Sequence, residues 1–144
     1  MTQLDLNQTR RCLCGNLRAT SRTLTQLYDE ALKPAGLRTT QFTLLVNIAR
    51  SGPVAVGQLA ETLLMDQTTL TRNLRPLERQ GWVARSIGAD QRTRLLVLTA
   101  PGNEVLGKAY PFWEQVQAQV AERLGQERLK AFLKELVALN TLLV

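Results

Sequence analysis

The segment from Gly57 to Thr99 constrains the fold more than any other part of the chain, because two kinds of periodicity follow each other in it. We predict a short helix, a turn, a second helix and then two strands. In the second helix Leu70, Leu74 and Leu77 recur with helical spacing, so they should pack inward. At about 100° per residue, the opposite face carries polar side chains: Thr68, Thr71, Arg72, Arg75 and Arg79.

The charge of the chain is concentrated in the same segment. The formal net charge is +6 over 144 residues, a length that suits a single compact domain. Between Arg72 and Arg94 six arginines stand against Glu78 and Asp90, whereas five basic residues balance five acidic ones from Pro101 onward. Hydroxyl and guanidinium groups on one helical face can reach base edges and phosphates in a major groove. Sequence-specific binding of double-stranded DNA is therefore the leading hypothesis.

The composition argues against several other classes of protein. The chain contains no histidine, and no set of nucleophile, base or metal ligands is visible, so we expect neither an enzyme nor a cofactor or metal. Two cysteines do not make a disulfide framework. No apolar run is long enough to span a membrane, and the first seven residues lack the features of a secretory leader. We expect a cytoplasmic protein without a membrane partner.

The first part of the chain favours two helices. Pro34 and Gly36 should end a long first helix, and Thr39 is placed to cap the next one. The predicted elements up to residue 64 are a helix over 7–33, a helix from Thr39 to about Arg50, a short strand over 54–56 and a helix over 57–64.

The central helix has clear signals at both ends. Asp66 is placed to act as its N-cap, and Gly81 should end it. Pro76 should kink the helix without ending it, because Leu77 continues the apolar stripe. The elements expected after it are strands over 82–85 and 94–98, a hairpin tip over 88–92, a helix capped by Thr99, and a last helix after a break near Gly125.

The last helix is too apolar to be covered by one chain. Its apolar residues occupy more than one helical face, so burial against a second copy of the chain is the expected remedy. These residues are Leu129, Phe132, Leu133, Leu136, Leu139, Leu142 and Leu143.

Several short motifs in the expected order resemble the winged helix-turn-helix of the MarR family of transcriptional regulators. The resemblance covers nearly the whole chain. The motifs that carry it are GLRTTQF over 36–42, GQLAE over 57–61, DQTTLTRNL over 66–74, LERQGWV over 77–83, DQR over 90–92 and LTAPG over 98–102.

The resemblance implies a mainly α fold with a small antiparallel β-hairpin wing. It implies one domain over 1–144, with a DNA-binding lobe over 37–99 and dimerisation helices over 5–34 and 102–144. The recognition helix would be 66–79, Arg92 would enter the minor groove, and Asp90 would brace it. The DNA-contacting residues are then expected to be Gln67, Thr68, Thr69, Thr71, Arg72, Arg75, Asp90, Arg92 and Arg94.

The first helix also resembles that of the organic-hydroperoxide sensors within this family. Cys14 falls on the oxidisable position, and Tyr28 matches one tyrosine that activates the thiolate there, whereas Thr39 and Phe42 stand in place of the others. Cys12 is a second candidate for a redox role. Two residues apart on a helix, the two cysteine side chains would point about 200° apart and could not close a disulfide within it.

These features and the resemblance predict a homodimer that binds a pseudo-palindromic operator and is released by an effector. Repression of transcription is the outcome that the resemblance implies. The expected effector is either a small phenolic molecule or an organic peroxide acting at Cys14. Tyr110, Phe112 and Trp113 could line a cleft for the phenolic molecule, although aromatics at this spacing are usually part of the core. Two alternatives stay open: an effector-independent architectural DNA-binding protein, and a helical dimeric adaptor for protein interactions.

Overall fold

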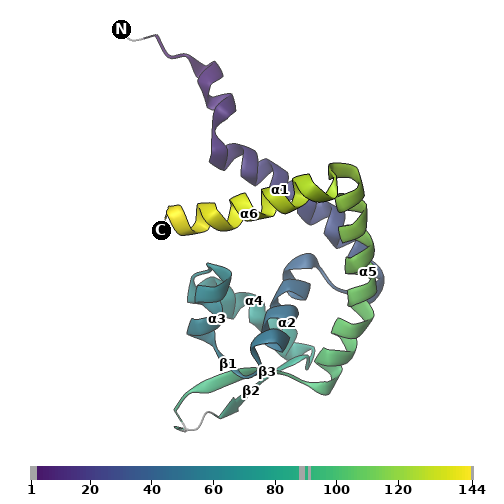
Figure 1. The fold of residues 1–144 in the computed structure, drawn as a ribbon. Coiled ribbons are helices and arrows are strands. Elements are labelled where there is room, and N and C mark those ends of the chain that lie inside the picture. The colour runs from purple at the N-terminus through teal and green to yellow at the C-terminus, as the bar shows by residue number, and fades with distance from the viewer. Residues whose placement is uncertain (1–2, 88–89, 91, 144) are drawn as a thin grey trace.

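The computed structural model describes residues 3–87, 90 and 92–143, most of which are helical (Figure 1). In chain order the elements are the 3-10 helix η1 (Leu6–Arg11), α1 (Leu13–Leu32), the 3-10 helix η2 (Lys33–Ala35), α2 (Thr39–Ser51), β1 (Val54–Ala55), α3 (Val56–Leu63), α4 (Gln67–Arg79), β2 (Val83–Ile87), β3 (Arg94–Leu98), α5 (Ala100–Leu124) and α6 (Gln126–Leu142). The predicted mainly α architecture with a small antiparallel sheet is confirmed.

The sheet is antiparallel, with β3 in the middle and the order β1–β3–β2. Strand β3 has the predicted bounds. Strand β2 begins one residue later and ends two residues later than predicted, because its pairing with β3 continues to Ile87 opposite Arg94. Strand β1 is shorter than predicted, since Val56 already belongs to α3; Val54 pairs with Leu96.

The core lies where α2, α3, α4 and the sheet meet. Leu70, Leu74 and Leu77 have no exposed surface, which confirms the inward stripe of α4. Helix α4 continues through Pro76 and ends at Arg79, with the turn at Gly81 following. Most other buried side chains of this core come from the same lobe: Phe42, Leu44, Leu45, Ile48, Val54, Leu59, Val83 and Leu96.

Helix α5 connects this lobe to the two terminal helices. It runs along one side of the molecule, from the sheet to the end where α1 and α6 lie (Figure 1). Thr99 caps α5 as predicted: its Oγ1 accepts a hydrogen bond from the Gly102 N–H at 3.1 Å and donates one to the Gly81 carbonyl at 2.6 Å. The start of α5 is therefore fixed to the turn that follows α4.

The prediction of one continuous helix over 7–33 is wrong. The chain forms η1, then breaks at Cys12, whose extended backbone (φ −64°, ψ 115°) precedes α1. Asp5 caps η1 by accepting a hydrogen bond from the Asn7 N–H, and the Cys12 sulfur accepts one from the Gly15 N–H. These local side-chain contacts compete with a continuous helix, and periodicity alone does not reveal them.

The predicted cap of α2 is also wrong. Arg38 occupies the N-cap position and Thr39 is already the first helical residue. The orphan N–H groups at this end find other partners: Gln41 Oε1 accepts from the Arg38 N–H at 3.0 Å, and Asp29 Oδ1 on α1 accepts from the Thr39 N–H at 2.7 Å. A carboxylate from another helix thus replaces the local threonine cap.

Among the residues that the structure describes, no helix combines the length and the apolar character that crossing a bilayer requires.

Candidate nucleic-acid interface

The outward face of α4 carries the polar side chains that helical periodicity predicted for it. Thr68, Arg72 and Arg75 are exposed and Thr71 is half-buried, and together with Gln67 they line one shallow hollow of the surface. The Gln67 side chain lies against the first turn of α3, because a Cβ added at Gly57 would be 3.1 Å from its Nε2. Hydroxyl, amide and guanidinium groups are thus gathered on a rigid helix whose opposite face is buried.

Asp66 holds the first turn of α4. Its carboxylate accepts hydrogen bonds from the Thr69 N–H at 2.8 Å and from the Thr69 hydroxyl at 2.7 Å, as an N-cap does. These bonds lower the pKa of Asp66 below its ordinary value. Since the folded pKa is the lower one, the cap stabilises the fold above the ordinary pKa, and this contribution is lost as the pH falls through the lowered value. Thr69 therefore has a structural role in addition to its predicted place among the DNA contacts.

A second aspartate holds the wing just before β3. Asp90 accepts hydrogen bonds from the backbone N–H groups of Arg92 (3.1 Å) and Thr93 (2.9 Å), and from the Thr93 hydroxyl (2.9 Å). These bonds lower the pKa of Asp90. Asp90 thus braces the backbone of Arg92, and the side chains of Arg92 and Arg94 are exposed. Three residues of the predicted tip, 88, 89 and 91, lie outside the described residues.

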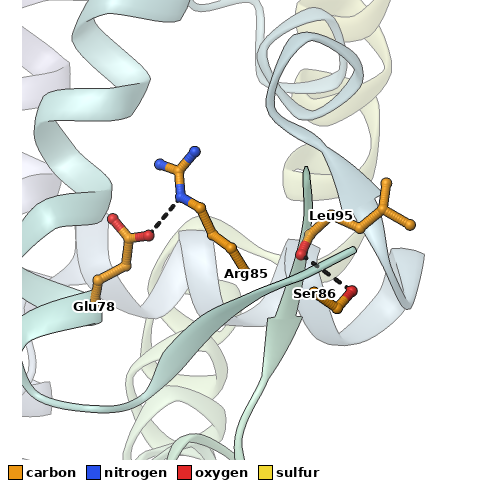
Figure 2. Close-up of polar contacts among 4 residues, drawn as sticks. All are labelled: Glu78, Arg85, Ser86 and Leu95. Carbon is orange, nitrogen blue, oxygen red and sulfur yellow. Dashed lines mark hydrogen bonds and ion pairs between the residues drawn. The ribbon is translucent and has the colours of Figure 1, made fainter. Parts of the chain in front are cut away.

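An ion pair between α4 and the wing was missed from the sequence. Arg85 Nε on β2 donates to Glu78 Oε1 on the last turn of α4 at 2.6 Å (Figure 2). Figure 2 also shows the neighbouring Ser86, whose hydroxyl donates to the Leu95 carbonyl across the sheet at 3.5 Å. The sequence signal for this pair was an acidic residue before the Gly81 turn and a basic residue after it. Whether the two side chains meet depends on the direction that the turn gives to β2.

The candidate redox residues do not come together within the chain. Cys12 and Cys14 are both exposed at the start of α1. Tyr28 stands fourteen residues after Cys14 on the same helix, which is about 21 Å along the axis, and its hydroxyl donates to Gln117 Oε1 on α5. Burial raises the pKa of the Tyr28 phenol. The expected 200° separation of the two cysteines does not apply, because Cys12 precedes the helix.

A cavity of about 630 Å³ lies among α1, α2, α5 and α6. Tyr110 and Trp113 line it, with ring centroids 5.5 Å apart, and Phe42 lies 6.1 Å from Trp113. Phe112 is not among the described lining residues; like Trp113, it packs against the core. No charged side chain is among the described lining residues, which are Leu17, Thr20, Ser21, Leu24, Thr25, Tyr28, Thr39, Phe42, Thr43, Val46, Asn47, Tyr110, Trp113, Phe132 and Leu136.

Two helices packed across a turn, followed by a β-hairpin, define a winged helix-turn-helix DNA-binding protein. Comparisons with known proteins agree with this class. The model of the MarR family matches residues 37–93. A helix-turn-helix transcriptional regulator of Bacillus cereus is 31% identical over 112 residues, which are 78% of this chain and 75% of that protein. The regulator YwoH of Bacillus subtilis is 33% identical over 89 residues, 62% of this chain and 65% of that protein.

Solved structures extend the likeness to almost the full chain. The transcriptional regulator MosR of Mycobacterium tuberculosis, solved in complex with DNA, is 38% identical with a TM-score of 0.79, covering 93% of this chain and all of that one. A mutant of MarR from Escherichia coli with operator DNA shares the fold at 24% identity, with a TM-score of 0.82 over 98% of this chain and 100% of that one. The chain belongs to the MarR family of DNA-binding transcriptional regulators.

Proposed function

We propose that this protein is a homodimeric repressor that binds a pseudo-palindromic operator and leaves it when an effector binds. The observation that carries the proposal is the outward face of α4, which presents Thr68, Thr71, Arg72 and Arg75 together. The helix is capped by Asp66 and its opposite face is buried. Two such helices related by a twofold axis would enter successive major grooves about 34 Å apart. Arg92 on each wing would reach the flanking minor groove.

Selection of bound sites from random DNA tests this proposal. We expect an inverted repeat with half-sites about one helical turn apart, because the two copies of α4 are related by symmetry. Affinity should fall steeply with salt, with a slope of about −0.9 for each phosphate neutralised. A preference below about tenfold for any site over random DNA would instead support the architectural alternative, since phosphate contacts alone carry no sequence information.

The proposed second copy is supported by apolar surface that one chain leaves uncovered. Helix α6 contains no buried residue, and more than half of the large exposed apolar side chains described lie on α1, on α6 or just after α6. Large apolar side chains exposed in such number on two helices favour an interaction site there. The residues concerned are Leu13, Leu24, Leu27, Phe132, Leu133, Val137, Leu142 and Leu143.

Leu133→Glu should convert the dimer into monomers, because the charge would be buried without a partner in the interface. Sedimentation of the purified chain measures this directly. Operator affinity should fall with it, since each monomer retains only one half-site contact. Lys134→Gln, on the same helix, changes the net charge by the same amount and should leave the dimer intact. A wild-type chain that sediments as a monomer with and without DNA would contradict the proposed assembly.

The uncharged cavity beside α2 supports a small neutral aromatic effector. Its walls combine apolar and aromatic side chains with hydroxyls such as those of Thr20, Thr25 and Thr43. It is bounded by terminal helices on one side and by α2 of the DNA-binding lobe on the other. A ligand held there would shift the separation of the two recognition helices only to the extent that it binds the two states differently.

A neutral naphthol should bind this cavity at least about tenfold more tightly than the naphthoate anion of the same ring, because a carboxylate would be buried there without a cation. Quenching of Trp113 fluorescence measures the affinity, and Trp82→Phe removes the other tryptophan. Thr43→Arg should reverse the preference.

Equal binding of the naphthol and the naphthoate would contradict this assignment of the effector. Release of DNA by a peroxide, lost in Cys14→Ser and independent of naphthol, would assign the signal to the thiol instead.

A further inference from the structure

The ion pair between Glu78 and Arg85 lies at the border of the proposed DNA surface. Glu78 follows Arg75 by three residues and Thr71 by seven, so the three share one side of α4. It is also the only acidic residue of this helix. A carboxylate at this place would repel phosphates, and the partner that neutralises it comes from β2 in the wing.

The geometry of the pair leaves most of the guanidinium available. Arg85 donates to Glu78 through Nε alone, on the side edge of the guanidinium, so the pair does not use the two terminal nitrogens. In Figure 2 both of them lie beyond Nε, and neither is joined to the carboxylate. Among the residues that the structure describes, no other polar contact of this guanidinium is found. The side chains of Arg85 and Glu78 are 34% and 27% exposed, so the pair is held in place but is reached by solvent.

The location of Arg85 matches a definite part of the duplex. If α4 enters a major groove and the wing enters the next minor groove, the sugar–phosphate strand that separates the two grooves has to pass between them. Arg85 joins the end of α4 to the wing at this position. We propose that Arg85 binds a backbone phosphate of that strand through its terminal nitrogens, and that Glu78 is the positioning residue that aims it.

The inference rests on the proposed DNA-binding mode and adds a contact to it. A planar guanidinium offers several donors in a fixed fork, so one edge can hold a carboxylate while another holds a phosphate. The contact fixes the register of α4 and the wing on the duplex, and it carries no base specificity.

Four chains test the proposal: wild type, Glu78→Gln, Arg85→Gln and the double variant. Their affinities are measured by fluorescence anisotropy on the selected operator and on a random duplex, between 50 and 200 mM salt (about the range over which one phosphate contact changes affinity threefold). Arg85→Gln should weaken binding to both duplexes alike. The ratio of wild-type affinity to variant affinity should fall about threefold across this range, because the loss of one phosphate contact makes the salt dependence shallower by about 0.9. Thermal melting shows that each chain is folded.

Glu78→Gln gives the distinguishing result. It should weaken operator binding in the otherwise native chain, although it removes a negative charge, because Arg85 loses its support. In the Arg85→Gln chain the same change should strengthen binding, because Glu78 there is only a repelling charge. Glu104→Gln, which removes the carboxylate of the exposed Glu104–Lys108 pair on α5, is the matched control and should show no such reversal.

The proposal is overturned by an unchanged salt slope in Arg85→Gln, or by a Glu78→Gln effect of the same sign in both backgrounds. A wild-type chain that binds no duplex contradicts the proposed function itself, which separates the two failures.

Discussion

Replacing Arg72 and Arg75 together with alanine is expected to reduce operator affinity by roughly 30-fold to 20,000-fold, from about 1–3 kcal/mol for each lost contact. Both side chains are exposed on the outward face of α4 and line the same hollow. Their removal should leave the core untouched, since neither contributes to the buried stripe. Anisotropy on the selected operator measures the loss, and circular dichroism follows the fold.

The matched control is the pair Arg123→Ala and Arg128→Ala, which removes the same charge from exposed positions on α5 and α6. That chain should lose affinity only through its lower net charge, and the loss should disappear at high salt. Retention of biological function by the Arg72 and Arg75 variant would favour the helical adaptor over a DNA-reading role.

Gly102→Ala should destabilise the fold by about 3 kcal/mol or more, because the added methyl group has no space. A Cβ at this position would lie 2.1 Å from the Trp82 carbonyl oxygen and 3.2 Å from the Leu98 side chain. The obstacle is backbone, so the start of α5 would have to move away from the turn after α4. Urea unfolding at 25 °C measures the change.

Gly107→Ala, in the same helix, is the matched control. A Cβ there meets nothing within 4 Å, so the change should stabilise the chain by about 0.5–1 kcal/mol through helix propensity. If Gly102→Ala unfolds at the wild-type urea concentration, the close contact between α5 and the turn at Trp82 is absent in solution.

The sequence was sufficient where a local pattern decides the structure. The stripe of Leu70, Leu74 and Leu77, the caps Asp66 and Thr99 and the bounds of β3 are all confirmed. Each depends on residues within about one or two turns of one another, and helix spacing and cap chemistry act over that range. The polar side of α4 followed from the same periodicity.

The errors arose where a nearby or distant side chain overrides the local pattern. The break at Cys12 follows from short-range hydrogen bonds in a stretch with helical spacing. The N-terminus of α2 is held by Asp29, ten residues earlier on another helix, so the local choice of Thr39 as a cap was wrong. The cavity takes only two of the three neighbouring aromatics, Tyr110 and Trp113, whereas Phe112 packs against the core, and local spacing alone did not separate them.

By itself the sequence determined the mainly helical class, the buried and polar faces of α4 and the concentration of positive charge beside them. The reason is that helical periodicity and the charge of a short segment are local properties of the chain. Only the tertiary structure decided which distant groups meet. It joined Glu78 to Arg85 across the turn, Tyr28 to Gln117 across 89 residues, and Thr99 to Gly81 at the start of α5. These contacts depend on how whole elements pack, and packing is a property of the assembled core rather than of any short stretch of chain.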